Sequence, residues 1–181
     1  MTKTSTLREL IKRLGRLDAA DTWRADLNPA QVSALGYLAR ANRFSRAPSH
    51  VADYLGTTRG TMSQTLKALE RKGYVAEARS ETDKRSIRYD LTPEGWAVTS
   101  QDGALDSALA DLDGSAVAGL EAALSEALKA MIAANGGKAF GQCRTCSHHV
   151  PGSEGARCAL LNVPLLPEEA DQICHEHRAT A

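Results

Sequence analysis

Aromatic side chains are scarce in this sequence, and long apolar runs are missing altogether. Phe, Trp and Tyr make up 4% of the 181 residues, while Ala and Leu supply most of the apolar mass, a balance that favours packed helices over a sheet sandwich. No run of about 18 apolar residues occurs, so we expect no membrane-spanning helix. The N-terminal residues also lack the continuous apolar core of a secretory signal. Together these absences predict a cytoplasmic protein without membrane association.

Signatures of catalysis are missing too. The sequence contains no recognisable nucleophile–base arrangement, no phosphate-binding loop and no carboxylate pair in an apolar setting. Because most enzymes depend on groups of this kind, we do not expect this chain to be an enzyme.

Net charge is absent from the chain as a whole but not from its parts. Residues 1–100 carry 17 Lys and Arg against 11 Asp and Glu, residues 101–140 carry 2 against 6, and residues 141–181 carry 3 against 5. The basic first half permits a polyanion such as nucleic acid as a ligand. The alternative is that these basic side chains are simply solvated and bind no polyanion.

Cysteine is absent from residues 1–142, and all four cysteines follow: Cys143, Cys146, Cys158 and Cys174. Clustered cysteines in a cytosolic chain favour metal binding over disulfides. A Cys-x2-Cys turn places two thiolates on one side of a knuckle, and two further cysteines complete a tetrahedral set. We therefore predict a metal centre in a module of residues 139–181, following a first domain of residues 1–138.

Two kinds of centre fit the cysteine spacing. One knuckle followed by two dispersed cysteines loosely resembles small four-cysteine iron–sulfur modules, so we favour an iron–sulfur cluster. Structural zinc is the alternative, although zinc ribbons usually offer two Cys-x2-Cys knuckles. Since four cysteines suffice as ligands, we expect the neighbouring histidines in solvent or around the ligands: His148, His149, His175 and His177.

Hydrophobic periodicity predicts helices through most of the first domain. A second helix begins after an Asn28 cap. A short third helix covers residues 50–55 after a Ser49 cap, and a fourth follows a Thr57 or Thr58 cap and runs to Lys72. The first and last helices carry apolar stripes at helical spacing: Leu7, Leu10, Ile11, Leu14 and Leu17 in the first, and Val117, Leu120, Leu124, Leu128 and Met131 in the last.

The pattern changes after the fourth helix. Residues 74–79 and 86–91 both fit short strands, and they flank a polar stretch. They therefore predict a β-hairpin with a long charged tip. Thr92 and Pro93 then begin another helix as its cap and first turn. Helix, tight turn, helix and charged hairpin follow one another in the order of a winged helix-turn-helix.

The fourth helix has two different faces. Met62, Leu66 and Leu69 form an apolar face that must pack on the third helix. On the opposite face, Arg59 and Gln64 can donate hydrogen bonds to base edges, and the helix N-terminus suits a phosphate. A solvated helix face is the alternative for this face alone. The candidate DNA contacts on this helix and on the hairpin tip are Thr58, Arg59, Thr61, Ser63, Gln64, Lys67, Lys84 and Arg85.

These segments resemble the recognition helix and wing of the MarR (multiple antibiotic resistance regulator) family. The resemblance is specific in LGTTRGTMSQ (residues 55–64), in LERKGYV (residues 69–75) and in DKRSIR followed by LTPEG (residues 83–95), and it covers residues 28–102. It implies a homodimer on a pseudo-palindromic operator, with recognition helices in adjacent major grooves and Arg85 in the minor groove. Asp83 would pair with a basic neighbour to hold the wing, or serve as a turn residue.

The same resemblance implies that the first and last helices form the dimer interface. The expected fold is therefore mainly α with a small β-hairpin wing: a winged helix-turn-helix that dimerises through its terminal helices and carries a small cysteine-rich metal module. The expected function is a repressor of transcription whose affinity for double-stranded DNA responds to an iron–sulfur centre that senses redox or iron status. We expect a change at that centre to shift the terminal helices.

Two other functions remain open from the sequence. The chain could be a repressor that responds to a small phenolic-type effector and carries a structural zinc tail. Alternatively, it could be an interaction module whose cysteine tail binds a partner protein.

Overall fold

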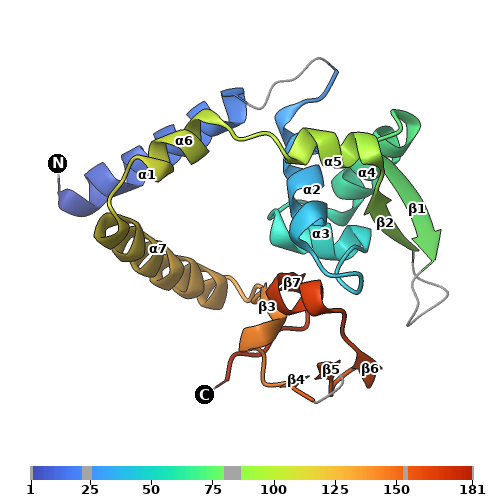
Figure 1. The fold of residues 1–181 in the computed structure, drawn as a ribbon. Coiled ribbons are helices and arrows are strands. Elements are labelled where there is room, and N and C mark those ends of the chain that lie inside the picture. Colours follow the sequence, from blue (N-terminus) through green and yellow to red (C-terminus); the bar gives the residue numbers. More distant parts are fainter. Residues whose placement is uncertain (1, 22–25, 80–86, 153–154, 181) are drawn as a thin grey trace.

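The computed structural model describes residues 2–21, 26–79, 87–152 and 155–180. Figure 1 shows a winged-helix unit, a helical arm to one side of it and a tail module in the lower part of the view. The winged-helix unit contains α2 (Pro29–Arg40), α3 (Pro48–Tyr54), α4 (Arg59–Arg71), β1 (Val75–Arg79), β2 (Ile87–Leu91) and α5 (Pro93–Thr99). The helical arm contains α1 (Lys3–Asp21), α6 (Ala104–Ala110) and α7 (Gly114–Ala134).

The tail module, the described part of residues 139–181, is built from very short elements. It contains the 3₁₀ turns η1 (Cys143–Thr145) and η2 (Pro167–Asp171) and the strands β3 (Gly141–Gln142), β4 (His149–Val150), β5 (Arg157–Cys158), β6 (Val163–Pro164) and β7 (Ile173–Cys174). Strands β3 and β7 pair with each other, and β4, β5 and β6 form a second small antiparallel sheet. The mainly helical fold with small sheets confirms the predicted class.

Polar caps begin three helices where the sequence predicts them. Asn28 accepts a hydrogen bond from the backbone N–H of Gln31 at 3.0 Å, and the Gln31 side chain accepts one from the backbone of Asn28 at 3.1 Å. The Thr58 side chain accepts from the backbone N–H of Thr61 at the start of α4, and the Thr92 side chain accepts from that of Gly95 at the start of α5. Because each cap satisfies backbone donors that the helix itself leaves unpaired, these starts are fixed locally.

The predicted start of the third helix is wrong. Ser49 does not cap α3, which begins at Pro48 with Ala47 in the cap position and no side-chain cap. Proline suits the first turn because its backbone angle is already helical and its missing N–H would have been unpaired there. The helix therefore begins two residues earlier than the predicted residue 50.

The winged-helix unit has one apolar core. Leu35 and Leu38 of α2, Val51 of α3, and Leu66 and Leu69 of α4 are fully buried in it. Burial of such side chains contributes about 1.5–3 kcal/mol each relative to exposure. This core orients α4 so that its opposite face remains in solvent.

The wing strands pair in antiparallel register from Val75 opposite Leu91 to Arg79 opposite Ile87. The predicted strands are thus confirmed, whereas the tip, residues 80–86, lies outside the described residues. A close approach fixes the base of the wing, because a Cβ atom on Gly95 would overlap the carbonyl oxygen of Tyr74.

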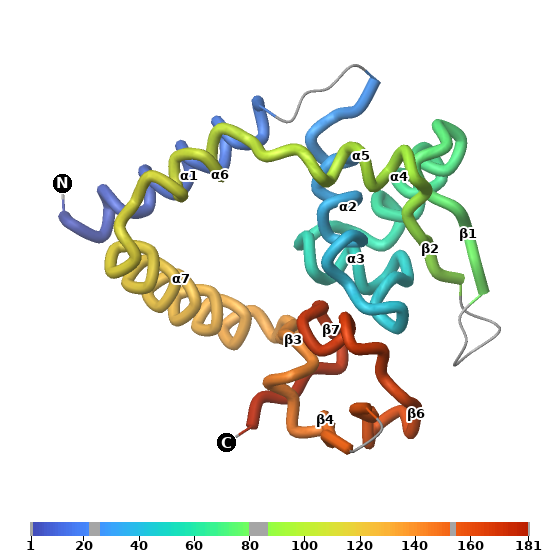
Figure 2. The backbone as a smooth tube through the Cα atoms, in the orientation of Figure 1, coloured from blue at the N-terminus to red at the C-terminus, as the bar shows by residue number. Residues whose placement is uncertain are grey.

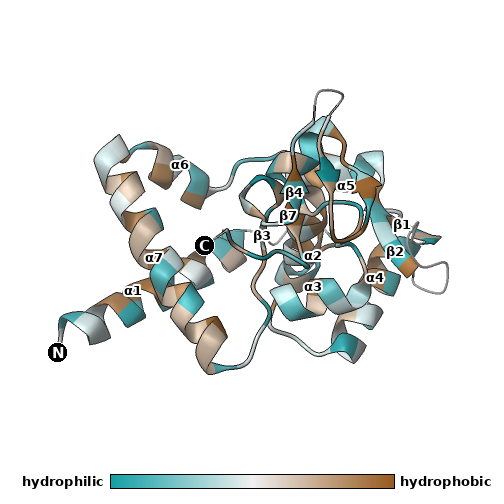
Figure 3. Cartoon of the chain, turned by 90° about the horizontal axis from the view of Figure 1, so that it is seen from below, coloured by the Kyte–Doolittle hydropathy of each residue, from teal (hydrophilic) through white to brown (hydrophobic). Residues whose placement is uncertain are grey.

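The helical arm buries very little of its apolar surface. In Figure 2, α1 runs beside α6, and α7 leads back toward the tail module. None of the described residues of α1 or α7 is buried, and the brown segments in Figure 3 mark the hydrophobic residues along both helices. Leu14 is 49% exposed and Leu124 is 41% exposed. Within the described residues, none of the helices combines the length and apolarity needed to cross a membrane.

Candidate functional site

The first candidate site is the exposed face of α4. Its apolar face is buried in the core through Met62, Leu66 and Leu69, as predicted. On the other side lies the set that we call the recognition face, in which Ser63 is half-buried and the rest are exposed: Thr58, Arg59, Thr61, Ser63, Gln64 and Lys67. Six of the eight predicted DNA contacts thus lie on α4 or at its N-cap, and five of the six are exposed.

The remaining two predicted contacts, Lys84 and Arg85, lie outside the described residues, and so does Asp83. The structure does describe the base of the wing. The backbone N–H of Tyr89 donates to the carbonyl oxygen of Arg46 at 3.1 Å, and the Arg46 guanidinium contacts Asp90 at 2.8 Å. The wing is therefore attached to the segment between α2 and α3, residues 41–47, which we call the docking loop.

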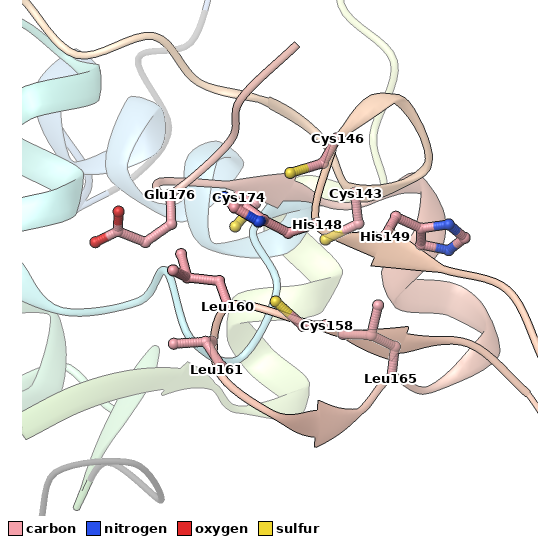
Figure 4. Close-up of a pocket in the computed structure, with 10 residues that line it drawn as sticks. All are labelled: Cys143, Cys146, His148, His149, Cys158, Leu160, Leu161, Leu165, Cys174 and Glu176. Atoms are coloured by element: carbon pink, nitrogen blue, oxygen red, sulfur yellow. The ribbon is translucent and has the colours of Figure 1, made fainter. Parts of the chain in front are cut away.

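The second candidate site is a pocket in the tail module that is lined by all four cysteines. Figure 4 shows their sulfur atoms facing a common space, with Leu160, Leu161 and Leu165 on its apolar side. The cysteines come from η1, its end, β5 and β7, and none of them forms a disulfide. The fold therefore collects residues that are widely spaced in the sequence.

Hydrogen-bond donors surround these sulfur atoms. The Asn42 side-chain amide donates to Cys143 Sγ at 3.3 Å, and the backbone N–H of Arg178 donates to Cys146 Sγ at 3.4 Å. A hydrogen bond from the Cys143 thiol lowers the pKa of Cys174 to about 6. The same hydrogen bond, together with burial, raises the pKa of Cys143. Since thiolates are the metal-binding form of cysteine, this hydrogen bond favours the ligating form of Cys174 and disfavours that of Cys143.

The histidines of the tail are less exposed than a purely solvated role requires. His148 and His149 line the pocket, and their Nε2 atoms are buried without a hydrogen-bond partner among the described residues. Figure 4 shows the His148 ring directed toward the sulfur atoms and the His149 ring directed away from them. His175 is half-buried and stacks on His50 with ring centroids 3.5 Å apart. Burial lowers the pKa of both stacked histidines to about 4.

The donor set of the pocket fits a thiophilic metal ion or cluster, because four sulfur atoms and a buried imidazole nitrogen share it. The arrangement is not that of a formed coordination sphere. Among the described residues, no three His, Cys, Asp or Glu side chains are close enough together to hold a metal ion. The pocket thus gathers four thiols and two buried imidazole nitrogens without the geometry of a bound metal.

Sequence reasoning missed the contacts that join the tail to the winged-helix unit. Glu169, only 2% exposed, forms an ion pair with Arg43 at 2.5 Å. Asn42 and Ser45 of the docking loop are fully buried. Nothing in the local pattern around these residues distinguishes them, because their partners lie more than a hundred residues away in the chain.

Comparison with known proteins identifies relatives of the winged-helix unit and the helical arm. Residues 25–86 match the model of the MarR family. Similar solved structures include the Staphylococcus aureus MepR–DNA complex, with a TM-score of 0.56, 20% identity and coverage of 72% of this chain and 99% of that chain. Wild-type Escherichia coli MarR in its apo form gives a TM-score of 0.53, 23% identity and coverage of 71% and 98%. The fold is that of the MarR-type winged helix.

A shorter similarity appears among characterised protein sequences. The chain is 44% identical over 41 residues to the HTH-type transcriptional regulator SarZ of Staphylococcus aureus, which corresponds to 23% of this chain and 28% of SarZ. The match thus spans little more than a quarter of the length of SarZ.

Proposed function

We propose that this protein is a transcriptional regulator, acting as a repressor, that binds a pseudo-palindromic sequence of double-stranded DNA as a homodimer. The observation that carries the proposal is the recognition face: a polar and basic surface at the N-terminal end of α4, held outward by a buried apolar face. The MepR structure and that of Streptococcus pneumoniae FabT (TM-score 0.53, 19% identity, 71% of this chain and 94% of that chain) are both complexes with DNA.

The residue types of the recognition face suit this role. Arg59 and Gln64 donate to base edges in the major groove, while Lys67 neutralises a phosphate. The N-terminus of α4, capped by Thr58, supplies backbone N–H groups that favour a second phosphate. Arg85 of the wing would reach the minor groove, and Lys84 would contact the DNA beside it. No enzymatic activity is part of this proposal.

A second copy of the chain is the proposed occupant of the exposed apolar faces of the helical arm. Two separate helices, α1 and α7, present such faces, and their leucines are about half exposed. Two copies that bury these faces against each other would remove a large apolar surface from water, at about 25 cal/mol per Å². A two-fold dimer also presents two copies of α4, as a palindromic duplex requires.

A salt titration tests DNA binding with the chain as it exists. The affinity for a duplex from the promoter region of its own gene is measured by fluorescence anisotropy at increasing salt. We expect log affinity to fall linearly with log salt, with a slope of roughly −0.9 for each neutralised phosphate. An interaction that is independent of salt, or no binding to this duplex, would count against the proposal.

The four cysteines are proposed to hold one metal centre per chain, either an iron–sulfur cluster or zinc. Support comes from their shared pocket and from the N–H donors around Cys143 and Cys146, since such donors stabilise metal-bound thiolates. A cluster would allow the chain to sense redox or iron status, whereas zinc would be structural. A small-molecule effector of the regulator is compatible with either metal.

Purification without air, followed by metal analysis, tests the centre. A cluster predicts a brown protein with iron and sulfide, and zinc predicts a colourless protein with one zinc per chain. Replacement of any of the four cysteines by serine should abolish the centre. A metal-free, colourless chain whose Cys143→Ser variant is unchanged would overturn it, and would favour a tail that binds a partner protein instead.

A further inference from the structure

The cysteine pocket lies against the DNA-binding unit rather than at the end of a free tail. Phe140 and Ile173 pack on the apolar core of the winged helix, and the Phe140 ring meets Tyr54 edge-on at 5.2 Å. The backbone N–H of Asn42 donates to the carbonyl oxygen of Ile173 at 3.0 Å. The tail module therefore docks on α3 and on the docking loop, and its hydrogen bonds are made to the docking loop.

Asn42 touches both the pocket and the loop. Its amide nitrogen donates to Cys143 Sγ, while its amide oxygen accepts from the Ser45 hydroxyl at 2.7 Å and from the backbone N–H of Phe44 at 3.2 Å. The side chain is fully buried, so these contacts cannot be exchanged for water without opening the interface. A single amide thus connects a cysteine sulfur with the conformation of the docking loop.

Other polar contacts hold the same interface. Ser45 Oγ accepts from the backbone N–H of His175 at 3.0 Å. The Arg43 guanidinium contacts Glu169 and also donates to the carbonyl oxygen of Pro164 at 2.9 Å. These contacts depend on a folded tail, whose buried apolar side chains among the described residues are Cys143, Cys146, Leu165 and Cys174. A bound metal would stabilise such a small fold.

From the docking loop the contacts continue into the DNA-binding elements. Arg46 makes two contacts with β2. Its carbonyl oxygen accepts from the backbone N–H of Tyr89, and its guanidinium donates to the Asp90 carboxylate. The loop also leads directly into α3, on which α4 packs. The loop is therefore attached at one end to the cysteine pocket and at the other to the wing and the helix-turn-helix.

We propose that occupancy of the cysteine site raises DNA affinity by fixing the docking loop through Asn42. The inference rests on the proposed DNA-binding function and gives it a means of regulation. When a metal is bound, Cys143 is held as a thiolate, and the amide of Asn42 donates a stronger, charge-assisted hydrogen bond to it. When the metal leaves, the tail loosens, and the loop loses the contacts that orient the wing and α3. Asn42 is a positioning residue in this scheme, and the route runs through the loop rather than through the terminal helices.

The test compares metal-loaded and metal-free full-length chain on one duplex of high affinity. The chain is loaded with Zn²⁺, or reconstituted without air with iron and sulfide, and the metal is then removed with a chelator. We expect removal to weaken duplex binding by at least about fivefold, within the usual range of coupling between sites. Asn42→Ala should still bind one metal centre but show the weaker affinity in both states.

Asn135→Ala is the matched control, because this asparagine is exposed and donates within its own helix end. The control should respond to the metal like the wild type. Loading with Co²⁺ adds a second measurement, which a purely structural role of Asn42 would leave unchanged. The thiolate-to-cobalt absorption band should shift in Asn42→Ala and not in Asn135→Ala. If Asn42→Ala does not fold, Ser45→Ala replaces it, because it removes one of the two donors to the Asn42 amide oxygen, the shorter of the two contacts.

Three results overturn the inference and can be told apart. Unchanged duplex affinity after the metal has left overturns the coupling and leaves the DNA-binding proposal intact. A metal response of Asn42→Ala equal to that of the wild type overturns the role of Asn42. Absence of duplex binding in both states overturns the proposed function, and the inference with it.

Discussion

At the contact between the tail module and the docking loop, polar side chains lie almost entirely out of solvent, among them Asn42 and Glu169. Asn42 is 0% exposed and Glu169 is 2% exposed. A buried polar group without a partner costs about 1–3 kcal/mol, and more when it is charged. Both residues are stable in place because a partner from the other part of the chain reaches them: Cys143 for Asn42, and Arg43 for Glu169.

Replacement of Glu169 by alanine tests how much this contact contributes. Arg43 would lose its carboxylate partner, and the free energy of unfolding should fall by about 2–3 kcal/mol. This value is below the ~3–5 kcal/mol of a fully buried pair, because the Arg43 side chain retains 18% exposure. Urea denaturation measures the change. Glu168→Ala is the matched control, because Glu168 is the adjacent residue and its carboxylate is exposed. An equal loss of stability in both variants would contradict a stabilising role of the Arg43–Glu169 ion pair.

At the scale of elements, the sequence predicted the helix starts that are set by a capping residue close by in the chain. Asn28, Thr58 and Thr92 lie within three residues of the backbone groups that they cap, so the starts of α2, α4 and α5 follow from the sequence. The start of α3 does not, because a proline at its first turn displaced the expected Ser49 cap. The four cysteines could be grouped from their spacing alone, whereas the docking loop could not be recognised, because its contacts are made by distant parts of the chain.

The recognition helix α4 carries a prediction of its own. Gln64→Ala should relax the base preference at one position of each half-site by about 1–3 kcal/mol, because the amide no longer discriminates between base edges. Anisotropy titrations with duplexes that differ at single base pairs measure this preference. Glu70→Ala is the control, because Glu70 is an exposed residue of the same helix that does not belong to the recognition face. This variant should leave the base preference unchanged. Identical base preferences of Gln64→Ala and the wild type would place the reading surface elsewhere.

At the scale of the whole molecule, the helical arm stands apart from the core. The winged-helix unit buries its apolar residues, yet the stripes of α1 and α7 remain in solvent in a single chain. Both stripes are visible in the sequence as helical periodicity, but a single chain does not show what covers them. A second copy completes the molecule in our proposal.

A charge placed in the stripe of α7 tests the dimer. Leu124→Asp should convert the protein to a monomer, because an unpaired carboxylate would have to be buried in an apolar interface. Light scattering coupled to size-exclusion chromatography reports the mass. Val150→Asp is the control, since Val150 has the same 41% exposure but belongs to the tail module. A wild-type chain that is monomeric at micromolar concentration would contradict the proposed assembly.

Selection of duplexes from a random library by the full-length chain tests sequence-specific, dimeric DNA binding most directly, because the operator does not have to be chosen in advance. We expect enrichment of an inverted repeat whose half-sites are centred about 10 base pairs apart, one turn of the double helix. Two chains should bind each selected duplex. Recovery of no common sequence, or of a single half-site occupied by one chain, would contradict the proposed function.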